Sequence, residues 1–225
     1  MTISKEFNWS LIHDEKEEIW KNPSVESFYL VNRWKAQGKT DFLDLGCGLG
    51  RHTILFGKND FKVTALDLSE EAVRRTKAWA EQECIRVNYA TGDMLALPFS
   101  ENSFDCILCR NVIGHTDTEG VKQIIESIKK ILRPGGECYL TLGSKLTWGW
   151  QQDWPVVDEN TKLRMEDGPE NEVPHFYADY KLVLDLFKDF EIIDIEHIQN
   201  FAKPFPETDE RASWHYHLLI RKREV

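Results

Sequence analysis

Short apolar runs with the character of β-strands alternate with helical segments along most of this 225-residue chain. Strand character marks seven runs, at residues 41–46, 61–67, 85–90, 104–109, 137–143, 190–198 and 214–222. Helix periodicity marks residues 51–58, 69–83, 118–132 and 179–189. This alternation is typical of an α/β domain with a mostly parallel sheet. A chain of this length is long enough to bury a sizeable core in one such domain.

Two regions fall outside the alternation. Residues 1–40 have helical character and carry several aromatic side chains, so we expect an N-terminal helical cap before a main domain at 41–225. Residues 144–177 lack clear periodicity and contain Trp148, Trp150 and Trp154. A connection this long inside a compact domain is usually functional or disordered, and its tryptophans argue against disorder. We therefore expect a substrate-side insertion or lid there.

Composition limits the compartment and the partners. The net charge of −10, from 38 acids and 28 bases, makes a nucleic-acid partner unlikely. No window resembles a transmembrane span, and the first 20 residues lack the apolar run of a secretory signal, so we expect a cytoplasmic protein. The odd number of cysteines, five, indicates reduced thiols. Cys106 and Cys109 are spaced to point to opposite faces of a strand, which disfavours a metal or redox pair.

Three glycines follow the first predicted strand in the stretch DFLDLGCGLGRH (41–52). A strand, a glycine turn and a helix in succession bring backbone close to a ligand at the carboxyl end of the sheet. A dinucleotide fingerprint starting at Gly46 would need glycine at position 51, which is Arg51. The carboxylate of Asp44 suits a cationic ligand group, and Arg51 suits an anionic one. A ligand with an ammonium, a carboxylate and a nucleoside meets both demands.

The stretch LDLGCGLGRH resembles the first motif of class I S-adenosylmethionine-dependent methyltransferases, in their small-molecule branch of the methyltransferase domain 11 or 25 type. The resemblance is closest over residues 40–143. It implies a Rossmann-like, doubly wound seven-stranded sheet in order 3-2-1-4-5-7-6, with the seventh strand antiparallel. It also implies S-adenosylmethionine as cofactor and S-adenosylhomocysteine as product.

The resemblance assigns roles to residues after successive strands. Asp67 closes the second strand and matches the acid that binds both ribose hydroxyls; Asp93 matches the acceptor for the adenine amine. Arg110 and Asn111 follow the fourth strand, beside the methionyl part. The complete set of implied cofactor residues is Asp44, Gly46, Gly48, Gly50, Arg51, Asp67, Leu68, Asp93, Met94, Arg110 and Asn111. Each motif also has a local explanation, such as a tight turn, a helix cap at Asp67 or an Asx-turn at Asp93. Their convergence on one crevice favours cofactor binding.

Catalytic residues are less clearly indicated, because an activated methyl group needs mainly alignment with its acceptor. A general base is required only if the acceptor arrives protonated. His115 and His175 are the catalytic candidates, with a helix-anchoring role for His115 and a surface-loop position for His175 as alternatives. The substrate-lid candidates, which could instead form a small core, are Trp20, Tyr29, Trp148, Trp150 and Tyr177. We predict no metal site.

The function that the sequence favours is methyl transfer to a small-molecule acceptor. After strand four, the chain lacks the D/N-P-P-Y motif of the family's amide or adenine-amine methyltransferases and the Pro-Cys nucleophile for pyrimidine C5. Three alternatives stay open: a methyltransferase for protein or RNA, a non-catalytic S-adenosylmethionine-binding module, and a nicotinamide dehydrogenase. The sequence does not name the acceptor or the atom that is methylated.

Overall fold

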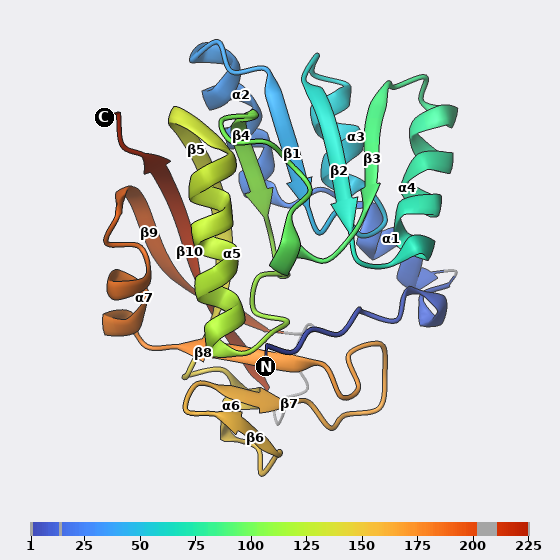
Figure 1. Ribbon diagram of the computed structural model, residues 1–225. Coiled ribbons are helices and arrows are strands. Elements are labelled where there is room, and N and C mark those ends of the chain that lie inside the picture. The colour runs from blue at the N-terminus through green and yellow to red at the C-terminus, as the bar shows by residue number, and fades with distance from the viewer. Residues whose placement is uncertain (1, 14, 202–210, 225) are drawn as a thin grey trace.

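A central β-sheet with helices on both faces forms the core of the computed structural model (Figure 1), which describes residues 2–13, 15–201 and 211–224. The strands are β1 (Asp41–Leu45), β2 (Lys62–Asp67), β3 (Val87–Thr91), β4 (Phe104–Cys109), β5 (Leu132–Ser144), β6 (Val156–Asp158), β7 (Thr161–Leu163), β8 (Pro174–Ala178), β9 (Phe190–Phe201) and β10 (Ala212–Lys222). The helices are α1 (Glu15–Lys21), α2 (Val25–Ala36), α3 (Arg51–Gly57), α4 (Glu70–Gln82), α5 (Thr118–Ile131), α6 (Trp148–Gln151) and α7 (Tyr180–Leu186), with 3₁₀ turns η1 (Trp9–Leu11) and η2 (Met94–Ala96). No helix in the described part of the chain is long and apolar enough to cross a bilayer.

The strand order confirms the predicted topology. Strands β3, β2, β1, β4 and β5 are neighbours in that order and run parallel. Next to β5 lies β10, which is antiparallel to both β5 and β9. Counting the runs predicted from sequence, β9 and β10 are the sixth and seventh strands, so the order is 3-2-1-4-5-7-6.

Three further strands lie in the region where no periodicity was visible. The antiparallel strands β6, β7 and β8 form a small sheet that joins the main one where β8 pairs with the end of β5. Strands β6 and β7 have three residues each, which is too short for an alternating pattern to show. We call residues 144–178 the insertion; it lies at the carboxyl ends of the parallel strands (Figure 1).

The sheet separates two apolar layers. On one face, α5 buries four isoleucines against the central strands, and Cys109 belongs to this layer. On the other face, α2 and α3 pack around Phe42, and Cys106 belongs there. The two cysteines thus lie on opposite faces of β4, as their spacing predicts.

The N-terminal 40 residues contribute to this core as well as to the ligand end. Helix α2 buries Leu30 and Trp34 against the sheet. Residues 2–12, which we call the strap, instead run across the carboxyl ends of the parallel strands (Figure 1). Ser4 forms a β-bridge with Thr116, and Arg75 donates to the carbonyl oxygen of Trp9 at 3.2 Å. A domain boundary at residue 40 stays a prediction.

One side chain links the strap to the start of α5. The carboxylate of Asp117 accepts the Gly120 N–H at 2.8 Å as a helix cap and the Ile3 N–H at 3.2 Å. Asp117→Ala should lower the free energy of unfolding by about 1 to 2 kcal/mol, because both donors lose their acceptor. Urea denaturation measures this. As a matched cap outside the strap, Asp179→Ala removes only the bond from the Leu182 N–H and should cost no more than about 1 kcal/mol. Equal losses would mean that the strap contact adds nothing.

Candidate functional site

The glycine turn after β1 is shaped by left-handed backbone that glycine adopts without strain. Gly48 has φ +54°, and its N–H donates to Asp67 Oδ2 at 2.9 Å. A Cβ built on Gly48 would lie 2.7 Å from the indole ring of Trp9. The backbone at Gly48 is therefore approached closely on its open side, and in this structure the strap makes that approach.

Asp67 is fixed at the end of β2 by two backbone donors. Oδ2 accepts the Gly48 N–H, and Oδ1 accepts the Ser69 N–H at 2.9 Å. The side chain is buried, and burial raises the pKa of its carboxyl group. Each carboxylate oxygen has lone-pair capacity for one more donor, so the group can both hold the turn and accept a pair of vicinal hydroxyls.

A cavity lies beside the glycine turn, and two charged groups, Asp44 and Arg51, line it. Asp44 is buried and accepts the Thr53 hydroxyl at 2.6 Å; burial raises its pKa to about 6. Arg51 lies over the ring of Trp20 at 5.5 Å, and burial lowers its pKa to about 10. Among the described residues, no carboxylate lies within 4 Å of the Arg51 guanidinium. This arrangement fits a zwitterionic ligand group, with the ammonium toward Asp44 and the carboxylate toward Arg51.

The strap occupies part of the site predicted for adenine. Asp93 Oδ1 accepts the Leu95 N–H at 2.9 Å, while Oδ2 accepts the hydroxyl of Ser4. A ligand amine that bonds to Asp93 Oδ2 would replace Ser4. The cavity measures about 130 Å³, below the roughly 300 Å³ at which small-molecule pockets begin. We therefore expect the strap to shift when a nucleoside enters.

The predicted cofactor residues converge on this one cavity. All of them line it except Gly50, which precedes α3 and whose Cβ would meet Thr76. Arg110 lines it while paired with Glu26 Oε1 at 2.7 Å. The individual roles of these residues stay predictions. We call this space the cofactor cavity.

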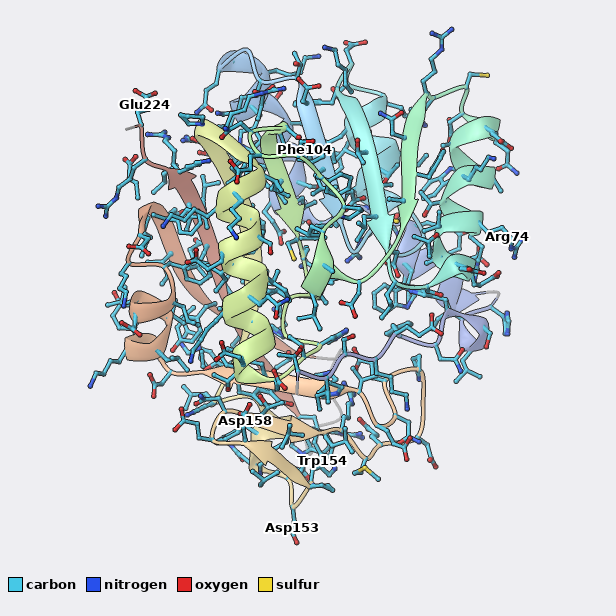
Figure 2. The ribbon with its side chains drawn as sticks, in the orientation of Figure 1. Arg74, Phe104, Asp153, Trp154, Asp158 and Glu224 are labelled. Atoms are coloured by element: carbon cyan, nitrogen blue, oxygen red, sulfur yellow. The ribbon has the colours of Figure 1, made fainter. Side chains whose placement is uncertain are left out.

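A second cavity of about 550 Å³ adjoins the first and is referred to as the acceptor cavity. Both cavities are lined by Asn111, Val112, His115 and Glu170. The acceptor cavity is walled further by Trp148, Trp154, Arg164, His175, Tyr177 and His215. Figure 2 shows Trp154 and Asp158 on the insertion, at the end of the molecule away from Glu224. The insertion therefore builds one side of the acceptor cavity.

Asn111 stands at the junction of the two cavities in an unusual conformation. Its φ of +57° is left-handed, a region that asparagine tolerates better than most residues. The Asn111 N–H donates to Thr141 Oγ1 at 2.8 Å, and the Thr141 hydroxyl donates to Asn111 Oδ1 at 2.9 Å. Non-glycine residues that surrounding contacts hold in a left-handed conformation are common at functional sites.

The two predicted catalytic histidines meet at the same junction. Their ring centroids are 5.0 Å apart, and the carboxylate of Glu170 lies within 4 Å of the Nε2 atom of each. Burial, together with His175, lowers the pKa of His115 to about 4, so its imidazole is neutral near pH 7. Glu170 was not predicted, because it is one of several acids in an aperiodic segment and only the fold brings it to the histidines. His215, expected to pack against neighbours, also lines the acceptor cavity.

The five lid candidates divide into three groups. Trp148 and Tyr177 line the acceptor cavity. Trp20 lines the cofactor cavity instead, packed against Phe7 and Trp9. Tyr29 and Trp150 line neither cavity, although the ring of Trp150 lies 5.6 Å from that of Tyr177, and a lid role for them stays a prediction. Tyr29 is 58% exposed on the outer side of α2, and Trp150 lies against the ammonium groups of Lys145 and Lys162.

Comparison with known proteins agrees with this geometry. Residues 42–136 match the sequence profile of a methyltransferase domain family. A ubiquinone biosynthesis O-methyltransferase of Coxiella burnetii is 29% identical over 120 residues, covering 53% of this chain and 50% of that protein. An uncharacterized methyltransferase of Schizosaccharomyces pombe is 30% identical over 127 residues, covering 52% and 44%. The chain thus spans about half the length of these relatives.

Solved structures share the fold at low sequence identity. A protein of Pyrococcus horikoshii superposes with TM-score 0.71 at 19% identity, covering 94% of this chain and 93% of its own. A 1,6-didemethyltoxoflavin-N1-methyltransferase of Burkholderia thailandensis, solved with its substrate and S-adenosylhomocysteine, superposes with TM-score 0.65 at 19% identity, covering 96% and 85%. The fold, the motif order and the profile match together define a class I methyltransferase domain. The match over residues 42–136 and these relatives support a class I S-adenosylmethionine-dependent methyltransferase, with S-adenosylmethionine as cofactor.

Proposed function

We propose that this protein transfers a methyl group from S-adenosylmethionine to a small-molecule acceptor bound in the acceptor cavity. The observation that carries the proposal is the shared wall of the two cavities, formed by Asn111, Val112, His115 and Glu170. A cofactor in the first cavity and an acceptor in the second would meet there. Reacting groups held in contact and away from water need little further assistance.

The residues of the cofactor cavity suit the cofactor's separate parts. Asp67 would accept the ribose hydroxyls, Asp93 the adenine amine, and Asp44 and Arg51 would hold the ammonium and carboxylate of the methionyl group. When bound, the cofactor supplies a methyl group already activated by a sulfonium centre. The chain therefore has to align the acceptor and exclude water more than to activate the donor. The strap and the insertion both lie at the carboxyl ends of the parallel strands (Figure 1), and the two segments contribute residues to the cavity linings.

The walls of the acceptor cavity support a small acceptor with aromatic character. Trp148, Trp154 and Tyr177 offer flat apolar faces, whereas the guanidinium groups of Arg164 and Arg211 are paired with Glu166 and Glu170. A planar molecule would stack on the aromatic faces. Among the relatives, an O-methyltransferase of ubiquinone biosynthesis and a toxoflavin N-methyltransferase are named for small-molecule acceptors, which supports the same class here.

The experiment for this proposal has two stages. Thermal melts with S-adenosylmethionine, S-adenosylhomocysteine and NAD come first; a ligand at 100 times its dissociation constant should stabilise the fold by about 2.7 kcal/mol. Mass spectrometry then follows S-adenosylhomocysteine release with a panel of aromatic hydroxyl, amine and thiol acceptors. Stabilisation by the two cofactor forms alone, with turnover of a low-mass acceptor, supports the proposal. Cofactor binding with turnover only of protein or RNA would replace it with the macromolecular alternative.

Asp67 provides the residue-level test. Asp67→Ala should weaken S-adenosylhomocysteine binding by about 1 to 3 kcal/mol, or roughly 5- to 150-fold, because the ribose hydroxyls lose their acceptor. Isothermal titration calorimetry measures the affinity. Asp189→Ala, at an exposed acid between α7 and β9, is the control and should bind as the unaltered protein does. Unchanged affinity in the Asp67 variant would reduce that residue to a cap for α4.

A further inference from the structure

Three potential metal ligands lie together at the junction of the two cavities: His115, Glu170 and His175, which we call the His–Glu–His trio. Their ligand atoms all lie within 4.8 Å of one another. His115 Nε2 is 3.6 Å from Glu170 Oε1, and His175 Nε2 is 3.7 Å from Glu170 Oε2. Two imidazoles and one carboxylate form a common ligand set of catalytic zinc and of other first-row divalent metals.

The hydrogen bonding of His175 favours a cation at this point. Its Nδ1 lies 3.0 Å from the carbonyl oxygen of Val173, which can only accept, so Nδ1 carries the proton. The other ring nitrogen, Nε2, lies 3.7 Å from the carboxylate of Glu170, so a cation placed there would have both as ligands. A backbone carbonyl that fixes the outer nitrogen is also the usual support for a metal-bound histidine.

From this arrangement we infer that the His–Glu–His trio binds one divalent transition-metal ion, with zinc the best match to its ligands. The metal takes Nε2 of both histidines and Oε1 of Glu170. Oε2 stays with Arg164, whose guanidinium already donates to it. This inference assigns ligand roles to the two histidines in place of a general-base role.

The spacing is compatible with a site that tightens on binding. Tetrahedral zinc with ligands at about 2.1 Å places its ligand atoms about 3.4 Å apart. His115 Nε2 is 3.6 Å from Glu170 Oε1, within a few tenths of an ångström of this value. His175 Nε2 is 3.7 Å from the other oxygen, Oε2, so the His175 imidazole has to move toward Oε1 to complete the site. The fourth position then faces the acceptor cavity, which the same three residues line. An open position of this kind is the mark of a catalytic rather than a structural zinc site.

The role of the metal rests on the proposed function. An acceptor hydroxyl or thiol bound at the open position loses its proton to water, because coordination lowers the pKa of the bound group. The resulting oxygen or sulfur anion faces the cofactor cavity. Its lone pair forms the bond to the methyl carbon, and the electrons of the broken carbon–sulfur bond remain on the sulfur of S-adenosylhomocysteine.

Metal binding can be tested without any turnover. The test uses a Cys84→Ser variant without a histidine tag, because the exposed Cys84 thiol could bind metal elsewhere. After chelation and dialysis it is titrated with Co²⁺, followed by its visible d–d absorption, and then with Zn²⁺ in competition. We expect one equivalent to bind. His175→Ala and Glu170→Gln should weaken binding on the order of a hundredfold, whereas the exposed His13→Ala should leave it unchanged.

The outcomes separate this inference from the proposed function. Melts with S-adenosylhomocysteine first confirm that each variant is folded and retains the cofactor cavity. A metal affinity that is absent, or that is the same in His175→Ala, His175→Gln and Glu170→Gln as in the starting protein, overturns the metal site. If the His–Glu–His trio binds metal but no acceptor is methylated, the metal site is supported and the proposed function is not. Turnover that survives complete chelation overturns the metal's role in catalysis.

Discussion

Glu137→Ala should lower the free energy of unfolding by about 3 kcal/mol, the largest stability loss that we expect from a single side chain outside the apolar core. Glu137 lies on β5 and has no exposed surface. Its carboxylate accepts from Arg33 on α2, from Arg221 on β10 and from the indole of Trp34, each at 2.9 Å. The alanine variant leaves two partly buried cations and a buried N–H without their acceptor.

The same residue predicts a pH dependence. Burial opposes ionisation, but the hydrogen bonds from Arg33, Arg221 and Trp34 outweigh it and hold the pKa of Glu137 at about 2, below the usual 4.5. Because the pKa is lowered on folding, the stabilisation is complete above about pH 4.5 and is lost as the pH falls toward 2. The difference in unfolding free energy between the unaltered protein and Glu137→Ala should therefore shrink over that interval.

Urea denaturation at several pH values from 2 to 7 measures both effects. Glu137→Gln keeps an acceptor for Trp34 without the charge and should fall between the other two proteins. Glu119→Ala, at an exposed position on α5, controls for loss of an ordinary surface acid and should change stability by less than about 0.5 kcal/mol. A difference that stays constant from pH 7 to pH 2 would show that the carboxylate charge contributes nothing.

Gly48→Val should abolish detectable cofactor binding, a loss on the order of a thousandfold or about 4 kcal/mol. The φ of +54° at this position is unfavourable for a β-branched residue. The added side chain would also lie where Trp9 now touches the turn, in the space that a nucleoside needs when the strap shifts. Calorimetry with S-adenosylhomocysteine measures the affinity, and a melt without ligand shows whether the variant is folded.

Gly38 offers a matched control for this substitution. It has φ +70°, and a Cβ built there meets no atom within 4 Å. Gly38→Val therefore imposes the same kind of backbone strain, about 1 to 2 kcal/mol, without obstructing either cavity. It should melt at a lower temperature and bind the cofactor normally. If both variants lost affinity equally, backbone strain rather than obstruction would explain the effect at Gly48.

Order along the chain predicted an α/β domain with a mostly parallel sheet, and the family resemblance implied the strand order and the cofactor residues. In an open parallel sheet, the carboxyl ends of neighbouring strands meet at one edge, so Asp44, Asp67 and Asp93, each at or just after a strand, had to converge. Strand and helix periodicity are local properties, and the predicted helices agree with the observed ones to within a few residues.

The acceptor side could not be predicted in the same way. Strands β6 and β7 have three residues each, and their pairing depends on contacts with β8 rather than on their own pattern. Glu170 reaches His115 only because the insertion folds back across the end of the sheet. Tyr29 and Trp150, expected as lid residues, line neither cavity, because aromatic content does not reveal which way a side chain faces.

The sequence by itself therefore determined the class of fold, because this follows from local pattern and chain order, and its resemblance to a known family implied the cofactor. Tertiary structure alone decided three things: that the strap lies against Gly48, that Glu137 joins α2, β5 and β10, and that two histidines and a carboxylate meet between the cavities. Each depends on long-range packing between segments that have no regular spacing in the chain.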